Sequence, residues 1–186
     1  MSVRYSPPRI GILAIHGSVE EHAIALNKLN FNSVEIRTPD DFANLAGLIL
    51  PGGESTTLTS LITKFNIKTE LKKFIQSDKP VFGTCAGLIL LAQFGFLDVE
   101  VKRNAYGRQL SSFEEDLKIP ILGKKKFPGV FIRAPRIVSV GKNIDILAQL
   151  NKVPVFVRQK NIFAASFHPE LTIDLRIHQL IFCKDN

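Results

Sequence analysis

Residues 80–92 read PVFGTCAGLILLA: an apolar segment, a turn of small residues around one cysteine, and a second apolar segment. The segment 80–82 predicts a buried strand, and 88–92 predicts a helix. A nucleophile held between glycines on a strand-to-helix turn is strained, exposed and aimed at the N-terminus of the helix. Backbone N–H groups and the helix dipole favour the thiolate there, so Cys85 is a candidate nucleophile.

The chain before this turn alternates between strand and helix patterns. The predicted strands are 10–15, 33–36, 46–50 and 80–82, and the predicted helices are 19–29, 69–77 and a segment that starts at Thr56. Ser18 is the expected N-cap of the first helix. This order favours an α/β fold, in which helices cover both faces of an open, mostly parallel sheet.

The second half of the chain is richer in strand patterns. The predicted strands are 97–102, 129–132, 144–150, 153–158 and 162–167, followed by a closing helix at 175–182. The segment 118–128 is the expected long surface loop. No repeat or linker divides the chain. We therefore expect one α/β domain with extra antiparallel strands in its C-terminal half.

Composition narrows the class of protein. A chain of 186 residues with 45% hydrophobic content is long enough for one sizeable core. The net charge of +7 comes from scattered basic residues apart from Lys124–Lys126, which favours a surface that attracts anions over a nucleic-acid-binding protein. Two cysteines, Cys85 and Cys183, fit a reducing compartment, and the apolar run 86–97 is too short to span a bilayer. We expect a soluble cytoplasmic protein.

A second motif, His168-Pro169-Glu170, supplies a base and a carboxylate two residues apart. In an extended chain residues i and i+2 face the same side, and the proline stiffens the pair. Glu170 can therefore orient the imidazole of His168 while His168 serves Cys85, which outlines a Cys-His-Glu triad. The other histidines have no such neighbour and are interpreted as structural or surface residues: His16, His22 and His178.

The loop Pro51-Gly52-Gly53-Glu54-Ser55 directly follows a predicted buried strand. Adjacent glycines let backbone amides approach a ligand closely, as in an oxyanion hole, and neither phosphate-loop pattern matches. Taken by itself, the loop is better explained as an ordinary tight turn, with Ser55 or Thr56 capping the next helix. Arg103-Asn104 and Arg133 each follow a strand pattern and could bind a carboxylate or form surface ion pairs. No metal-ligand motif occurs, so we expect no metal.

Together these motifs resemble the class I (triad) glutamine amidotransferases. More narrowly, they resemble the PdxT/SNO family, the glutaminase subunits of pyridoxal 5′-phosphate synthase. The matching segments are LPGGESTT at 50–57, FGTCAGLILLA at 82–92, RNAYGRQ at 103–109, FIRAP at 131–135 and SFHPELT at 166–172. The resemblance extends from Ile10 to about Phe182. The segments at 103–109 and 131–135 narrow it from the superfamily to the family.

The resemblance implies a flavodoxin-like fold in one domain, 1–186, with 1–8 as a short lead-in. It implies that Cys85 is the nucleophile, that His168 is the general base and then acid, and that Glu170 orients His168. The residues implied to bind glutamine are Gly52, Gly53, Glu54, Arg103, Ile132 and Arg133. The backbone amides of Gly53 and Ala86 are implied to form the oxyanion hole.

The implied activity is hydrolysis of L-glutamine to L-glutamate and ammonia. The implied partner is a (β/α)₈-barrel synthase subunit, which consumes the ammonia within a hetero-oligomer. The implied chemistry needs no cofactor, because pyridoxal phosphate is the product of the complex. Neither a nucleic acid nor a membrane is an expected partner.

The chain departs from the family pattern at two places. Family members usually carry Leu-Gln-Gly after the first strand, where this chain has Ile15-His16-Gly17, so His16 stands at a switch that responds to the partner. The stretch 92–97 is also shorter than usual. Three other hypotheses stay open: a non-hydrolysing docking subunit of the same complex, an ammonia donor for a different synthase, and another cysteine enzyme on a related α/β fold.

Overall fold

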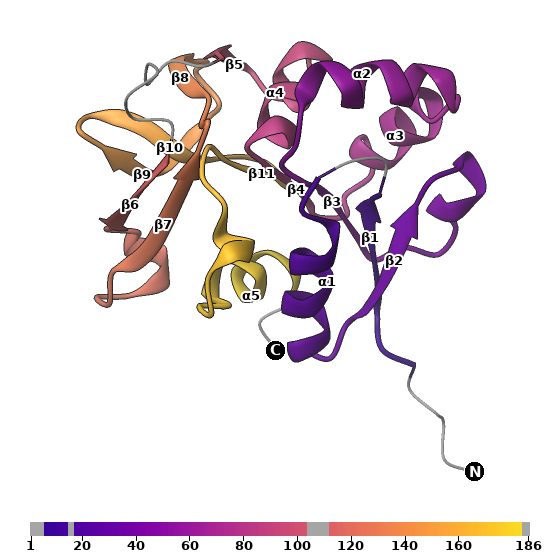
Figure 1. The fold of residues 1–186 in the computed structure, drawn as a ribbon, viewed down its shortest axis with the longest axis horizontal. Helices are drawn as coiled ribbons and strands as arrows, with labels where there is room; N and C mark the ends of the chain where they lie inside the picture. Colours follow the sequence, from indigo (N-terminus) through magenta and orange to yellow (C-terminus); the bar gives the residue numbers. More distant parts are fainter. Residues whose placement is uncertain (1–5, 15–16, 104–111, 184–186) are drawn as a thin grey trace.

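A computed structural model of the chain describes residues 6–14, 17–103 and 112–183. Seven strands form one sheet in the order β2-β1-β3-β4-β11-β10-β9 (Figure 1). The bounds are β1 (Arg9–Leu13), β2 (Asn32–Ile36), β3 (Gly47–Leu50), β4 (Val81–Thr84), β9 (Asp145–Leu150), β10 (Val153–Gln159) and β11 (Ile162–Ala165). The first five strands in this order are parallel to one another. The strand β10 pairs antiparallel with both of its neighbours, β11 and β9. The predicted fold class, a mostly parallel sheet with late antiparallel strands, is confirmed.

Helices cover both faces of this sheet (Figure 1). On one face lie α1 (Val19–Lys28) and α5 (Arg176–Phe182), and on the other lie α2 (Ser55–Lys64), α3 (Lys68–Ile75) and α4 (Ala86–Gln93). Successive strand residues point to opposite faces, so Ile49 packs with α1 and α5, whereas Leu48 and Leu50 pack with α2 to α4. Burial on both faces explains the continuous apolar runs in the sequence.

Two short antiparallel ribbons complete the described part of the chain. They pair β5 (Val99–Lys102) with β8 (Arg136–Val140), and β6 (Ser112–Leu117) with β7 (Phe127–Ile132). The sequence patterns did not predict β6 or β8. In β6 the run Glu114-Glu115-Asp116 has low strand propensity, and the ribbon is held by tertiary contacts such as the stacking of Phe113 on Phe131, with ring centroids 4.7 Å apart.

The predicted long surface loop at 118–128 is only partly a loop. It contains a 3₁₀ turn, η2 (Pro120–Leu122), and the start of β7, and both Ile119 and Phe127 are buried. The guanidinium of Arg176 donates hydrogen bonds to the carbonyl oxygens of Leu122, Lys125 and Lys126 at 3.2, 2.8 and 2.9 Å. A side chain from α5, about fifty residues away in sequence, therefore fixes this segment.

The prediction that Ser18 is the N-cap of α1 is confirmed, although its side chain makes no capping hydrogen bond. Its backbone N–H instead donates to the carbonyl oxygen of Gly52 at 3.3 Å, so a loop contact positions it. Glu54, and neither Ser55 nor Thr56, stands at the N-cap position of α2.

The carboxyl ends of β1, β3, β4 and β11 meet at one edge of the sheet, because these strands are parallel neighbours. In open α/β sheets this edge is where ligands bind. The glycine loop follows β3, the Cys85 turn follows β4 and the His168 motif follows β11, whereas Arg103 follows β5 and Arg133 follows β7. Among the described residues, no helix has the length and apolar character needed to cross a membrane.

Candidate active site

Cys85 occupies a strained turn between β4 and α4. Its backbone has φ 48° and ψ −100°, a region that costs a non-glycine residue about 1–3 kcal/mol. Its N–H donates to the carbonyl oxygen of Ala165 at 2.8 Å, which ties the turn to the end of β11. The thiol therefore lies at the N-terminus of α4, as the sequence predicted. The prediction that Cys85 is exposed was wrong, because the surrounding loops leave only 6% of the residue accessible.

The glycines on either side of Cys85 allow α4 to lie close to the sheet. A Cβ atom added to Gly87 would lie 1.9 Å from the carbonyl oxygen of Leu50 in β3. One added to Gly83 would lie 2.7 Å from Leu91 Cδ1. Real Cβ contacts are not this short, so only glycine fits at either position. Close packing of the helix against the strands holds the strained turn in place.

His168 and Glu170 lie beyond the end of β11 and face each other. The backbone N–H of His168 donates to the carbonyl oxygen of Val130 in β7 at 2.8 Å. His168 Nδ1 lies 2.8 Å from Glu170 Oε1, and the side chain of Glu170 is fully buried. The turn η3 (Pro169–Leu171) places the carboxylate beside Nδ1 of the ring.

The groups around His168 favour its protonated form, the imidazolium. Burial opposes it, but hydrogen bonds to Cys85 and Glu170 outweigh burial and raise the pKa of His168 to about 10. Burial also opposes ionisation of Glu170, yet the nearby His22 and the hydrogen bond from His168 lower the pKa of Glu170 to about 2. At neutral pH the site therefore holds a carboxylate and an imidazolium beside the sulfur atom of Cys85. The thiol itself lies 3.8 Å (Sγ to O) from the carbonyl oxygen of Ile132.

A cavity of about 800 Å³ opens beside these residues at the carboxyl edge of the sheet. The predicted site residues that line it are Gly52, Gly53, Glu54, Cys85, Arg103, Ile132, Arg133 and His168. Glu170 and Ala86 lie behind its wall, both buried, with Ala86 as the first residue of α4. His16 lies outside the described residues, as do residues 104–109 of the family motif, although the neighbouring Gly17 lines the cavity.

The glycine loop after β3 closely approaches the reactive side chains. A Cβ atom added to Gly52 would lie 2.4 Å from His168 Cε1 and 3.4 Å from Cys85 Cβ. Gly53 has φ 155°, and Gly17, at φ 115°, is so close that an added Cβ would lie 1.6 Å from the carbonyl oxygen of Gly52. The lack of side chains here lets backbone groups of the loop reach the Cys85–His168 pair.

The rim of the cavity carries charges of both signs. Glu54, Arg103 and Arg133 all line the cavity and are exposed. Arg103 Nη1 donates to Thr56 Oγ1 at 3.2 Å, and Glu54 accepts a hydrogen bond from Thr57. Two guanidinium groups and one carboxylate can together bind a molecule that has both a carboxylate and an ammonium group.

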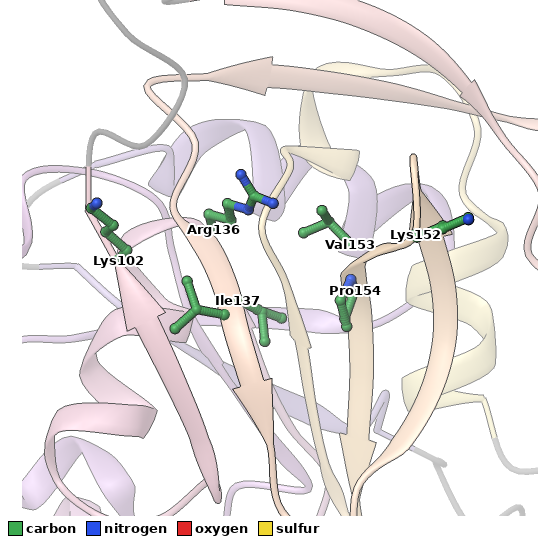
Figure 2. Close-up of a pocket in the computed structure, with 7 residues that line it drawn as sticks. Lys102, Arg136, Ile137, Lys152, Val153 and Pro154 are labelled. Carbon is green, nitrogen blue, oxygen red and sulfur yellow. The ribbon is translucent and has the colours of Figure 1, made fainter.

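A second cavity, of about 310 Å³, lies between β8 and the turn that joins β9 to β10 (Figure 2). Figure 2 shows Arg136 between Lys102 and Lys152, with Ile137, Val153 and Pro154 forming apolar walls. Its described lining residues include no thiol, imidazole or carboxylate. This cavity therefore attracts anions but lacks the groups for nucleophilic or acid–base chemistry, which the first cavity holds.

Sequence reasoning missed two residues near the site, His22 and His178. Both are fully buried, and His22 Nε2 lies 3.5 Å from Glu170 Oε2. No spacing rule connects positions 22, 170 and 178, which come together only in the folded chain. The one available signal was that both histidines fall on apolar faces of predicted helices.

Known proteins that resemble this chain are of a kind that fits the geometry of this site. The family model described as the SNO glutamine amidotransferase family matches residues 12–185. The pyridoxal 5′-phosphate synthase subunit PdxT of Thermotoga maritima is 47% identical over 180 residues, covering 92% of this chain and 96% of that protein. The same subunit from Dictyoglomus turgidum is 48% identical over 181 residues, covering 92% and 95%. A solved structure described as a glutamine amidotransferase superposes with a TM-score of 0.87 at 43% identity, covering 92% of this chain and 96% of that one.

Proposed function

Because the chain belongs to the SNO glutamine amidotransferase family, we propose that it is the glutaminase subunit of a pyridoxal 5′-phosphate synthase. In this function it hydrolyses L-glutamine to L-glutamate and ammonia. One observation carries the proposal for the site. Cys85 stands on a strained turn at the N-terminus of α4, beside His168 under Gly52, and Nδ1 of His168 faces the buried carboxylate of Glu170.

The charged rim suits the free amino acid. The α-carboxylate of glutamine pairs with Arg103 or Arg133, and its α-ammonium group pairs with Glu54. The side chain then points inward, so that its carboxamide carbon meets the sulfur of Cys85 below Gly52 and Gly53. The backbone of Ile132 lines the same wall.

The first half of the reaction releases ammonia. In the reacting state the proton of Cys85 resides on His168, so the sulfur attacks the carboxamide carbon as a thiolate, and the carbonyl electrons move onto oxygen. Backbone N–H groups of Ala86 and Gly53 donate to this oxyanion, and the α4 N-terminus adds favourable polarity. The carbon–nitrogen bond breaks as His168 gives its proton to the nitrogen. Ammonia leaves, and a glutamyl thioester and a neutral His168 remain.

The second half hydrolyses the thioester. His168 takes a proton from water, and the hydroxide attacks the thioester carbon at the same oxyanion site. The carbon–sulfur bond breaks, the sulfur leaves as thiolate, and the product departs as a carboxylic acid that ionises in water. The thiolate and imidazolium are restored, and glutamine plus water has become glutamate plus ammonia. Glu170 holds the ring in place through both halves.

The names of the relatives support a partner as well. They are subunits of a synthase, and we propose that the ammonia passes to a (β/α)₈-barrel synthase subunit. We also propose a cytoplasmic location, since the chain has only two cysteines, as is typical of proteins in a reducing compartment. The chemistry above uses only side chains, backbone amides and water. We therefore expect glutamate release to be unchanged by EDTA, without any metal or cofactor.

The test is glutamate release by wild type, Cys85→Ala and Cys183→Ala, each with and without the synthase subunit. Cys85→Ala should lose at least roughly 10⁴-fold in rate while still binding the synthase. Cys183→Ala is the matched control, because Cys183 is exposed at the end of α5, and it should keep full activity. If wild type releases no glutamate in either condition while the complex forms, the chain is a docking subunit and the proposal fails.

A further inference from the structure

A row of buried polar side chains continues behind Glu170, on the side away from His168. Glu170 Oε1 faces His168, whereas Oε2 is buried and has no hydrogen-bond partner within ordinary distance among the described residues. His22 Nε2 lies 3.5 Å from this oxygen and 3.2 Å from Thr84 Oγ1. His22 Nδ1 lies 3.0 Å from His178 Nε2. The row runs from α5 through α1 to the end of the sheet.

Two helices bring these histidines together. Figure 1 shows α1 and α5 side by side on one face of the sheet, and the contact between His22 and His178 joins them. Both rings also pack edge-on against Phe82, with centroids 6.2 and 5.9 Å away. These apolar walls exclude water, so each polar atom of the row depends on its neighbours.

The carboxylate of Glu170, at one end of the row, determines which ring nitrogens of His22 and His178 carry a hydrogen. A carboxylate can only accept, so a lone pair on His22 Nε2 would be repelled by Glu170 Oε2. Nε2 therefore carries the hydrogen of a neutral His22, and Nδ1 accepts from His178 Nε2–H. This leaves His178 Nδ1 as a buried acceptor without a partner among the described residues, whereas the reverse assignment would leave a buried N–H donor there.

We propose that His22 is a positioning residue for glutamine hydrolysis. Its Nε2–H is shared between Thr84 Oγ1 at 3.2 Å and the inner oxygen of Glu170 at 3.5 Å, while His178 fixes the ring of His22. Glu170 then faces a donor at each oxygen, His168 on one side and His22 on the other. Such a chain of hydrogen bonds strengthens each of its members in a dry interior. The inference rests on the proposed function, because it assigns a further residue to that same site.

The charges around the row agree with this assignment. Burial lowers the pKa of His22, and the charge on His168 lowers it further, against the opposing effects of Glu170 and Glu21. Burial and the neighbouring His22 lower the pKa of His178 to about 3. Both rings are therefore neutral at physiological pH. Because a neutral His22 carries no positive charge, it stabilises the Glu170 carboxylate without competing with the His168 imidazolium for that carboxylate.

The test compares His22→Leu, His22→Gln and Leu26→Ala in the full chain with the synthase subunit. His22→Leu should lower kcat roughly ten- to hundredfold, the loss of one hydrogen bond to a buried charge. KM should stay constant, because His22 does not line the cavity. His22→Gln should recover much of kcat, since its amide also donates. Leu26→Ala, one turn along α1 and fully buried, is the matched control: it loses stability and should keep kcat.

A second measurement needs no glutamine, and its first part uses the wild type alone. In ¹⁵N-labelled wild type, the imidazole shifts of His22 should report a neutral ring with its hydrogen on Nε2. In the variants, the resonance of His168 Nδ1–H should move in His22→Leu and stay in place in Leu26→Ala. A hydrogen on Nδ1 of His22, a charged His22, or equal kcat in His22→Leu and wild type would overturn the inference. A wild type that fails to hydrolyse glutamine would instead overturn the proposed function, and the NMR result would still decide the role of His22.

Discussion

Gly52 shows how one residue without a side chain shapes the site. The sequence predicts that the glycine loop lets backbone amides approach a ligand, and the structure shows what occupies the freed space. The ring of His168 lies where a Cβ of residue 52 would be, at 2.4 Å from Cε1. Gly52 is therefore needed to admit the imidazole as well as a substrate.

Substituting alanine at Gly52 tests this packing. The added methyl group must displace the His168 ring, and a misplacement of about 1 Å at a reacting group costs about 10²-fold in rate. We expect glutamate release by Gly52→Ala to fall by about that factor. Gly123→Ala is the control: nothing lies within 4 Å of its added Cβ, and its φ of 90° affects stability alone. An active Gly52→Ala variant would show that the ring is not held as described.

For single residues, the sequence predicts a role in the site only where the partners lie close by in the chain. Cys85 has its glycines beside it, and Glu170 stands two residues from His168. The contact of His22 with His178 spans 156 positions, so no local pattern could reveal it. Such contacts depend on how helices pack, which a single sequence does not show.

At the scale of elements, the position of the nucleophile depends on the contact between α4 and β3. Alternating strand and helix patterns predicted both elements to within a few residues. Their close approach depends on Gly87, whose missing side chain leaves room for the Leu50 carbonyl. The missed strand β6 shows the limit of the patterns, because its three consecutive acidic residues depend on pairing with β7.

Gly87→Ala separates helix propensity from packing. In an exposed helix this change would stabilise by about 1 kcal/mol. Here the methyl group would lie 1.9 Å from the Leu50 oxygen, so α4 must move away from β3 and carry Cys85 with it. We expect a lower free energy of unfolding in urea together with a loss of glutamate release. Increased stability with full activity would contradict the close packing described here.

At the scale of the whole molecule, the buried triad and its histidines link stability to pH. Glu170, with its pKa lowered to about 2 from 4.5, stabilises the fold above pH 4.5 and loses this effect as the pH falls toward 2. His178, lowered to about 3 from 6.5, resists a proton that the unfolded chain accepts, so stability falls as the pH drops from 6.5 toward 3. His22 acts in the same direction. His168, raised to about 10 from 6.5, stabilises fully below pH 6.5 and loses this effect as the pH rises toward 10.

The expected result is a maximum of the melting temperature near pH 6.5, with a decline on both sides. Differential scanning calorimetry from pH 3 to pH 10 measures it. His178→Leu should flatten the acid side, because the residue that resists protonation is gone, and should leave the alkaline side in place. An acid side identical to that of wild type would show that His178 is not held neutral in the fold.

The central claim is that Cys85 forms a covalent bond with the carboxamide carbon of glutamine. The most direct test mixes the chain and its synthase subunit with L-glutamine, quenches the reaction in acid within its first turnovers, and maps the digested peptides by mass spectrometry. We expect a glutamyl group on the peptide that contains Cys85, present in Cys183→Ala and absent in Cys85→Ala. Release of glutamate with no glutamyl group on Cys85, or with the group on Cys183, would contradict it.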